Sequence, residues 1–354
     1  MLKKIDYLPF LEACWQEHLA PRAPNAPMVI SLFTGCGGSS LGYSMAGFRE
    51  LLAVDWDKNA AATFRLNFPD VTFWQGDIVQ LSDDEALRLA GVKSGQLDVL
   101  DGSPPCQGFS TAGKRQLNDS RNSLFHEYVR LLRAFNPRAF VMENVSGLVK
   151  GKMKLIFAEI MKELKASGYR VSCRLLNAMW FNVPQSRERL IWIGVREDLE
   201  IKPSHPGAEN KPIVVREAFN KLPLQSVPKY LASGQVAKII HEMRQGEDGS
   251  KASLRLNGNE NKWFNLRRLN WNMPGFTITK AEGSSILIHP ETDRVISITE
   301  MQRIMSFPDA TQFTGKFKEI KACIGNSVPP LFMRAIALHI RNLLTGIEPR
   351  LVET

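Results

Sequence analysis

Five short apolar segments, each followed by a glycine turn or ending near an acidic residue, constrain the fold of this chain more than any other feature. They cover residues 28–33, 50–55, 71–78, 97–101 and 139–143, and helix-like stretches separate several of them. Such alternation predicts a mostly parallel sheet with helices on both faces. Two further apolar segments, residues 171–177 and 190–195, predict additional strands. We therefore expect a doubly wound α/β domain over residues 28–195.

The first apolar segment runs into a glycine-rich turn, Thr34-Gly35-Cys36-Gly37-Gly38, before a helix-like stretch. This order lets a backbone approach a nucleotide at a helix N-terminus, although the spacing departs from the GxGxxG dinucleotide fingerprint. Asp55 follows at about the 20-residue spacing of a ribose-binding carboxylate. Trp56 beside it is suited to stack on an adenine ring. A helix cap is the alternative role for Asp55, but together these signals favour an adenosine-type cofactor.

The fourth apolar segment runs into Pro104-Pro105-Cys106-Gln107. The two prolines end the strand because neither can donate a ladder hydrogen bond. Cys106 is therefore expected at the carboxyl end of a strand, the edge where open α/β sheets bind ligands. A thiol there is a candidate nucleophile, whereas a buried structural cysteine is the alternative. The local residues alone leave both interpretations open.

The charge and the cysteine usage restrict the partners and the environment. The formal net charge is +9, which favours a polyanionic partner, and residues 114–154 alone hold nine Lys or Arg against three acidic residues. The five cysteines and six histidines are scattered. Their spacing argues against a disulfide framework or a zinc site and fits a reducing cytoplasm. Without a long apolar run or a secretory signal, we expect a cytoplasmic protein with no membrane partner and no metal.

The pattern changes after residue 195, where prolines interrupt any regular alternation. Regular structure returns at Thr299, where the stretch to Gln302 predicts a capping box, and a last helix is expected from Pro329-Pro330 toward Leu344. We expect a leader and linker at residues 1–27, a main domain at residues 28–195 and 292–354, and a smaller, loop-rich domain at residues 196–291.

Seven motifs, in this order, resemble those of the DNA (cytosine-5) methyltransferases over residues 28–195 and about 292–342. They are Phe33-Thr34-Gly35-Cys36-Gly37-Gly38, Asp55-Trp56, Gly76-Asp77-Ile78, Pro104-Pro105-Cys106-Gln107, Glu143-Asn144-Val145, Gln185-Ser186-Arg187-Glu188-Arg189 and Gly325-Asn326-Ser327-Val328. One glycine-rich turn would be weak evidence, but the order of all seven leaves little room for coincidence.

The resemblance implies an S-adenosylmethionine-dependent, Rossmann-like methyltransferase with a target-recognition domain at residues 196–291. Its substrate would be a cytosine flipped out of duplex DNA, its product S-adenosylhomocysteine, and no metal would take part. Because C5 of cytosine is a weak nucleophile, a thiolate must first add to C6, and the resemblance assigns this role to Cys106. Glu143 would hold N3 and N4 of the base, Arg189 would hold O2, and Arg187 would brace Glu143.

The resemblance also implies binding residues for the cofactor and for DNA. The expected cofactor contacts are Phe33, Gly35, Cys36, Gly37, Gly38, Asp55, Trp56, Asp77, Ile78, Pro104, Leu124, Asn326 and Ser327. The expected DNA contacts are Gln107, Ser110, Lys114 and Arg121, in a loop over residues 107–123, and Arg267, Arg268 and Thr277 farther along. Arginine is the commonest reader of guanine edges, although contact with phosphate alone is the alternative for Arg267 and Arg268. We expect a monomer, and a cognate restriction endonuclease stays open as a second partner.

Three other functions remain to be distinguished from this one. A transfer-RNA cytosine-5 methyltransferase would share the chemistry, but the long insert favours DNA. A nicotinamide oxidoreductase is disfavoured by the glycine spacing and the Pro-Pro-Cys turn. A DNA-binding protein on an inactive methyltransferase scaffold is disfavoured by the intact Cys106 and Glu143. The recognised DNA sequence cannot be predicted, because recognition inserts read DNA by loop geometry.

Overall fold

The computed structural model of the chain describes residues 4–105, 123–149, 153–222, 234–258, 263–280 and 285–346. The chain forms two compact units, each assembled from separate segments. We call residues 16–177, 188–207 and 333–354 the sheet unit, and residues 1–15, 178–187 and 208–332 the loop-rich unit. The second unit therefore includes more of the chain than the single insert that we expected at residues 196–291.

The sheet unit is built on seven strands, which confirms the predicted doubly wound α/β fold. They are β1 Met28–Leu32, β2 Arg49–Asp55, β3 Thr72–Gln75, β4 Val99–Gly102, β5 Ala139–Val145, β6 Tyr169–Asn177 and β7 Glu188–Arg196. Their order is β3-β2-β1-β4-β5-β7-β6, with parallel pairing from β3 to β5 and an antiparallel β7 between β5 and β6. The strand order reverses between β1 and β4, and such a reversal places a ligand crevice at the carboxyl ends of the strands.

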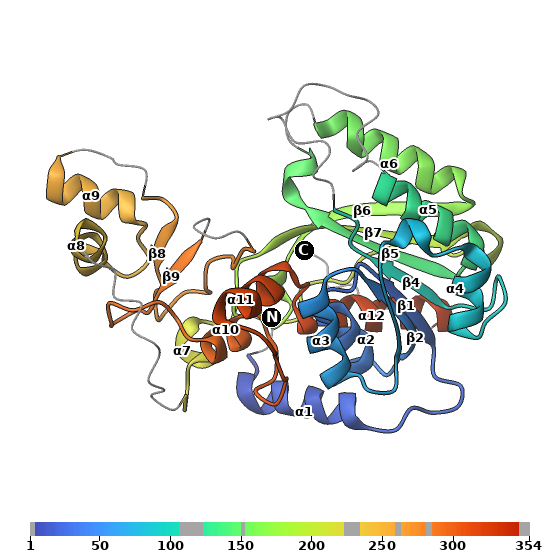
Figure 1. Ribbon diagram of the computed structural model, residues 1–354, viewed down its shortest axis with the longest axis horizontal. Coiled ribbons are helices and arrows are strands. Elements are labelled where there is room, and N and C mark those ends of the chain that lie inside the picture. Colours follow the sequence, from blue (N-terminus) through green and yellow to red (C-terminus); the bar gives the residue numbers. More distant parts are fainter. Residues whose placement is uncertain are drawn as a thin grey trace. The chain divides into compact units, whose positions relative to one another are not determined.

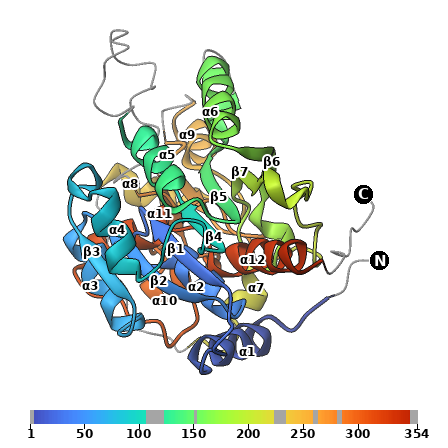
Figure 2. The ribbon, with the colours of Figure 1, turned by 90° about the vertical axis from the view of Figure 1, so that its right-hand side faces the viewer.

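Helices cover both faces of this sheet (Figures 1 and 2). On one face lie α4 Asp83–Ala90, α5 Ser123–Phe135 and α6 Lys154–Ala166, which enclose a large apolar core with the sheet. On the other face lie α2 Gly38–Met45, α3 Lys58–Asn67 and the part of α12 Pro330–Thr345 that belongs to this unit. Phe140 and Tyr169 meet edge to face in the core, with ring centroids 5.2 Å apart. This packing holds the strand ends in fixed positions.

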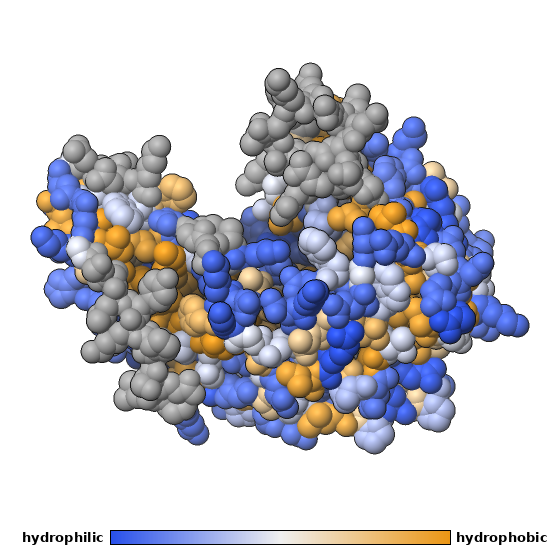
Figure 3. All heavy atoms as spheres, viewed as in Figure 1, coloured by the Kyte–Doolittle hydropathy of each residue, from blue (hydrophilic) through white to orange (hydrophobic). Residues whose placement is uncertain are grey.

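The loop-rich unit contains more regular structure than its sequence indicates. It holds α7 Val215–Ala218, α8 Gln235–Glu242, α9 Gly249–Asn257, β8 Leu266–Arg268, β9 Ile286–Ile288, α10 Ile298–Ile304, α11 Phe317–Asn326 and the first part of α1 Tyr7–Leu19. A small apolar core of six buried residues joins α8, α9 and the two strands: Ile239, Ile240, Met243, Ala252, Leu266 and Ile288. Hydrophilic and hydrophobic residues lie next to each other on the surface of this unit (Figure 3).

The predicted capping box lies two residues nearer the N-terminus than expected. The backbone N–H of Glu300 donates to Ser297 Oγ at 3.1 Å, and the carboxylate of Glu300 accepts from the Ser297 N–H at 2.6 Å. Thr299 is therefore inside α10 rather than at its start. The sequence holds two overlapping patterns here, and only the serine pattern places an acidic side chain at the third helical position.

Candidate active site

The glycine-rich turn after β1 has a backbone that few residues other than glycine adopt. Gly35 and Gly37 have φ of +56° and +92°, and Phe33 has the unusual value of +57°. A Cβ on Gly37 would lie 2.7 Å from the Phe68 ring, whereas one on Gly35 would meet nothing within 4 Å. The turn is therefore packed from beneath and open at Gly35, directly before the N-terminus of α2. A ligand has room there to approach the backbone.

Asp55, at the end of β2, is tied to this turn. Its Oδ2 accepts a hydrogen bond from the Gly35 N–H at 2.7 Å, and its Oδ1 accepts one from the Asp57 N–H at 2.9 Å. Burial raises the pKa of the Asp55 carboxyl. The side chain thus stabilises the turn in addition to any ligand contact. The N-terminus of α3 is capped by Asp57, whose Oδ1 accepts from two N–H groups.

The other predicted cofactor residues of the sheet unit lie on neighbouring elements. Trp56 is 77% exposed, and Asp77 is exposed while its Oδ1 accepts from the Val79 N–H at 3.1 Å. Gly38 starts α2, Cys36, Ile78 and Pro104 are buried, and Leu124 is half-buried on α5. A carboxylate beside an open glycine turn, followed by an exposed indole, has the chemistry to hold ribose hydroxyls and an adenine ring. These residues fit an adenosine-type cofactor.

Asn326 and Ser327 belong to the loop-rich unit, at the end of α11. Asn326 is exposed, whereas Ser327 is buried and donates from Oγ to the Cys323 carbonyl at 2.8 Å. The hydroxyl of Ser327 is thus used to end the helix.

Glu143 and Arg189 form an ion pair on adjacent strands of the sheet unit. Arg189 lies opposite Val145 in the β5–β7 register, and Glu143 lies on the same face two residues away. The Nε of Arg189 is 2.5 Å from Oε1 of Glu143, and both side chains are at most 14% exposed. Arg189 therefore braces Glu143, a role that we had predicted for Arg187.

The turn that leads to Cys106 is held by Asn144, the residue after Glu143. Its side-chain amide donates to the Pro104 carbonyl at 2.9 Å, and its Oδ1 accepts from the Val145 N–H at 2.9 Å. Cys106, Gln107, Ser110, Lys114 and Arg121 lie outside the described residues. The bond to Pro104 nevertheless fixes the chain two residues before the predicted nucleophile. Sequence reasoning had assigned no role to Asn144, although it lies in a quoted motif.

Arg187 has a different role from the one predicted, because its guanidinium is buried inside the loop-rich unit. It donates to the carbonyls of Ile278 at 2.9 Å and of Gly325 and Ser327 at 3.0 Å each. The residue is 1% exposed. Arg187 therefore joins its own segment to two others, one at residue 278 and one at residues 325–327.

A short two-stranded contact lies beside Arg187. The N–H of Gly275 donates to the Pro184 carbonyl at 2.8 Å, and the N–H of Ser186 donates to the Gly275 carbonyl at 2.9 Å. Thr277 donates from Oγ1 to the Ser186 carbonyl at 2.8 Å. We call residues 184–187 and 275–278 the connecting ladder. The hydroxyl proton of Thr277 is used within the ladder, which speaks against the predicted bond from this hydroxyl to a phosphate.

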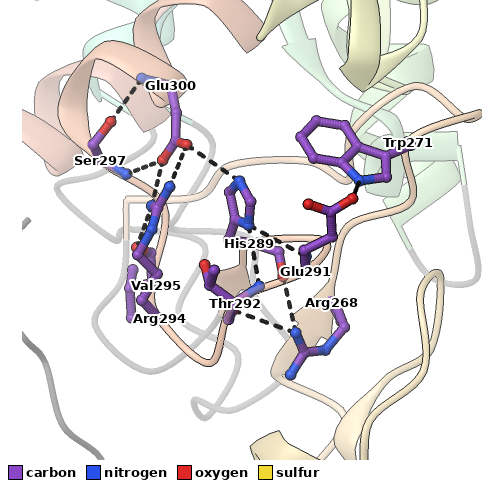
Figure 4. Close-up of polar contacts among 9 residues, drawn as sticks. All are labelled: Arg268, Trp271, His289, Glu291, Thr292, Arg294, Val295, Ser297 and Glu300. Atoms are coloured by element: carbon purple, nitrogen blue, oxygen red, sulfur yellow. Dashed lines mark hydrogen bonds and ion pairs between the residues drawn. The ribbon is translucent and has the colours of Figure 1, made fainter. Parts of the chain in front are cut away.

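Arg268 is also a structural residue in this conformation. Its guanidinium donates to the carbonyls of Ile240 at 2.6 Å and His289 at 3.1 Å, and to the Asp293 carboxylate at 2.5 Å. The side chain is 5% exposed. Figure 4 shows Arg268 pointing toward the turn that carries His289 and Thr292. Its burial speaks against the predicted contact with DNA.

The same close-up shows that charged groups around Arg268 form hydrogen bonds and ion pairs with other residues of the loop-rich unit. Glu300 accepts from both terminal nitrogens of Arg294 at 2.7 Å, and Trp271 donates from its indole to Glu291 at 2.6 Å (Figure 4). His289 lies edge to face with Trp271, and burial lowers the pKa of its imidazole. On α10, Arg303 is held by the Asp309 carboxylate and by the carbonyls of Ala218 and Asn220.

Arg267, the neighbour of Arg268 on β8, is more accessible. It is half-buried, its Nε donates to the Phe264 carbonyl at 3.3 Å, and its guanidinium carbon lies 5.1 Å from the centroid of the Phe276 ring. A guanidinium stacked on an aromatic ring keeps donors in its plane for a ligand. Of the two predicted arginines, Arg267 alone retains the accessibility that a DNA contact needs.

Two absences apply to the part of the chain that the structure describes. There, no group of three or more His, Cys, Asp or Glu side chains is arranged to hold a metal ion. In the same residues, no helix combines the length and the apolar character that crossing a membrane requires.

Comparison with known proteins gives the family. The family model for C-5 cytosine-specific DNA methylases matches residues 28–342. The chain belongs to this family. The Type II methyltransferase M1.HphI of Haemophilus parahaemolyticus is 36% identical over 342 residues, which cover 90% of this chain and 87% of the relative. The Type II methyltransferase M.XorII of Xanthomonas oryzae is 32% identical over 90% of this chain and 85% of its own.

Solved structures of methyltransferases share the fold. A prophage-encoded protein of Escherichia coli, named as a DNA modification methyltransferase, superposes with a TM-score of 0.71 at 26% identity and covers 90% of this chain and all of its own. DNMT2 of Spodoptera frugiperda has a TM-score of 0.66 at 20% identity over 90% of this chain and 100% of its own, a likeness of fold alone. The family membership confirms the resemblance inferred from the seven motifs, and the chain is a DNA cytosine-5 methyltransferase.

Proposed function

We propose that this protein methylates C5 of a flipped-out cytosine in a specific duplex DNA sequence, with S-adenosylmethionine as the methyl donor and S-adenosylhomocysteine as the product. The observation that carries the proposal is the buried Glu143–Arg189 pair, next to an asparagine that holds the turn before Cys106. The carboxyl group of Glu143 on β5 and the turn that follows the neighbouring strand β4, which leads to Cys106 in the sequence, support this proposal. The family membership is the independent support.

The proposed chemistry follows from these side chains. The thiolate of Cys106 adds to C6 of the extruded cytosine, and Glu143 holds N3 and N4 while the electron pair moves into the ring. When bound, the cofactor supplies an electrophilic methyl group for C5. Loss of the C5 proton then lets the C6–sulfur bond break, which regenerates the thiolate. Extrusion of the base costs roughly a few kcal/mol of stacking and pairing, which protein contacts must offset.

For the remaining partners we propose the simplest arrangement. The residues that would hold the cofactor are Asp55, Trp56, Asp77 and the backbone of the turn at Gly35. Residues 196–291 would select the target sequence, with Arg267 as the candidate base contact. We expect a monomer in the cytoplasm, where bacterial DNA lies, and a cognate restriction endonuclease stays open, as the named relatives are Type II methyltransferases.

Bisulfite sequencing of plasmid DNA from cells that express the protein tests the proposal directly. We expect protected cytosines within one recurring sequence, and none in cells that express Cys106→Ser. Duplex DNA carrying 5-fluorocytosine at that site should trap the wild-type protein covalently, because no C5 proton can leave. A stable adduct with Cys106→Ser would overturn the assignment of the nucleophile. Methyl transfer to transfer RNA and not to duplex DNA would overturn the proposal that duplex DNA is the substrate.

A further inference from the structure

A chain of buried polar groups runs from the glycine-rich turn into the sheet unit. Thr34, the first residue of the turn, lies with its Oγ1 at 3.0 Å from Ser40 Oγ on α2, and both hydroxyls are buried. Ser40 donates in turn to Oε1 of Glu50 on β2 at 2.9 Å. Because Ser40 uses its proton on Glu50, Thr34 is the donor in the first bond. The predicted cofactor turn is thus linked by two hydrogen bonds to a carboxyl group inside the fold.

The surroundings of Glu50 disfavour a negative charge. Its buried Oε2 has the Ser31 hydroxyl on β1 as its polar neighbour, without a hydrogen bond of full geometry between them, and among the described residues Glu50 takes part in no ion pair. The titratable groups that face it are Asp101 on β4 and Tyr43 on α2, and neither is a cation. A buried carboxylate without a cation is costly, and the neutral acid is the favoured form. Burial, reinforced by Asp101, accordingly raises the pKa of Glu50 to about 8.

We propose that Glu50 is a positioning residue for cofactor binding, which fixes the turn at Thr34–Gly38 through Ser40 and Thr34 with its carboxyl group protonated. The inference rests on the proposed function, since it concerns the same cofactor site. It goes beyond that function because Glu50 belongs to none of the seven motifs. Once Glu50 ionises, the buried charge must be relieved by rearrangement of the groups around it, and α2 and the turn move with Ser40. Alkaline pH should therefore loosen the turn.

Calorimetric titration of the full chain with S-adenosylhomocysteine tests this proposal between pH 6 and pH 9. The informative quantity is the ratio of the wild-type dissociation constant to that of Glu50→Gln, because titration of the ligand and of Asp101 largely cancels in it. Glutamine has the shape of the protonated acid and cannot ionise. If only protonated Glu50 is competent, the wild-type fraction that binds falls to roughly one tenth at pH 9. We expect a ratio near one below pH 7 and about tenfold larger at pH 9.

A pair of serine variants on α2 separates positioning from general destabilisation. Ser40→Ala breaks the link to Thr34 and should weaken binding of S-adenosylhomocysteine at every pH. Ser44→Ala is the matched control, since Ser44 bonds to His18 and Arg22 rather than to the turn. It should lower the melting temperature with little change in affinity. Equal losses of affinity in both variants would show that stability alone matters.

Hydrogen exchange in the protein without cofactor gives a readout that does not depend on binding. After correction for the intrinsic effect of pH, the amides of Gly35 and Gly37 should lose protection above pH 8 in the wild type and keep it in Glu50→Gln. A flat ratio of dissociation constants together with unchanged protection would overturn the proposal, as would loss of binding by a folded Glu50→Gln at pH 7. If the wild type fails to bind the ligand at any pH while the exchange follows the prediction, the proposed cofactor site is wrong and the positioning role stands.

Discussion

The two units use charged side chains in opposite ways. In the sheet unit, hydrogen bonds between strands and a large apolar core maintain the fold, and the predicted cofactor contacts Trp56 and Asp77 stay exposed near strand ends. In the described part of the loop-rich unit, the sheet has two short strands, and buried arginines hold irregular segments together through backbone carbonyls. An arginine in a region of sparse regular structure is therefore weak evidence for nucleic-acid binding. The predictions below test this contrast.

The largest effect should come from Glu143 in the sheet unit. Glu143→Gln keeps the shape but removes the carboxyl chemistry and leaves the Arg189 guanidinium without its counter-ion. A positioned acid–base group contributes typically 10²–10⁴-fold to rate, and we expect methyl transfer to fall within that range while the fold persists. Radiolabelled methyl transfer to duplex DNA, with circular dichroism as a check of folding, measures both. Glu159→Gln, at an exposed position of α6, is the control, and a Glu143→Gln variant with normal turnover would remove Glu143 from the mechanism.

Loss of a buried arginine should instead unfold the loop-rich unit. Arg268→Met removes a buried guanidinium that makes three hydrogen bonds to backbone carbonyls and pairs with the exposed Asp293 carboxylate, and removing one partner of a buried hydrogen bond costs about 1–3 kcal/mol. Arg267→Met, one residue away and stacked on Phe276, should change the free energy of unfolding by at most about 0.5 kcal/mol. Urea unfolding of the two variants compares them directly. Equal midpoints would contradict the contrast between buried and accessible arginines.

Substitution of Arg267 should affect DNA binding rather than the free energy of unfolding. If it contacts a guanine, Arg267→Ala should lose about 1–3 kcal/mol of discrimination between the true site and one-base variants. If it contacts phosphate only, affinity for all duplexes should fall together, with a salt slope lower by about one. Binding measured at two salt concentrations distinguishes the two outcomes.

The carboxylate of Asp55 is expected both to bind the cofactor and to stabilise the fold by accepting backbone hydrogen bonds. Removing a charged hydrogen-bond partner costs about 1.5–3 kcal/mol, or roughly ten- to a hundredfold in affinity. Asp55→Ala should weaken S-adenosylmethionine binding by that factor. It should also lower the free energy of unfolding, because the N–H groups of Gly35 and Asp57 lose their acceptor; the sequence alone gave no reason to expect this cost. Asp70→Ala, at an exposed loop position, is the control, and unchanged calorimetric affinity for Asp55→Ala would move the ribose site elsewhere.

A separate effect should appear in the pH dependence of stability. Burial raises the pKa of Asp101 to about 7, well above that of an unfolded aspartate. The native state therefore retains a proton that the unfolded state has lost, and stability falls as pH rises from about 4 to 7. The slope is about 1.4 kcal/mol for each pH unit. Asp101→Asn should remove this contribution, which urea midpoints at pH 5, 6 and 7 would show; parallel curves for both proteins would refute it.

The sequence predicted the sheet unit well because each of its strands carries a local signal. Short apolar segments and the residues that end them depend on neighbours in the chain, and all seven strands were found. Glu143 and Asp55, which the motifs singled out, likewise lie at the carboxyl ends of parallel strands, as predicted. What could not be predicted is pairing over long sequence distances. The residues next to Arg187 and Arg189 in the sequence do not indicate which arginine reaches Glu143. Those next to Arg268 do not indicate that its guanidinium donates to groups within the protein.

The connecting ladder bears on how target specificity can be exchanged between related enzymes. Residues 275–278 pair with residues 184–187, and Gly325 lies so near that an added Cβ would be 2.6 Å from the backbone of Thr279. Recombination that replaced residues 196–291 as one block would import a foreign strand of this ladder. Exchange that left residues 271–280 in place would keep the three carbonyl groups that accept hydrogen bonds from Arg187. Among related enzymes, sequence differences should therefore accumulate in two separate stretches, before and after residues 271–280, and these residues should change slowly.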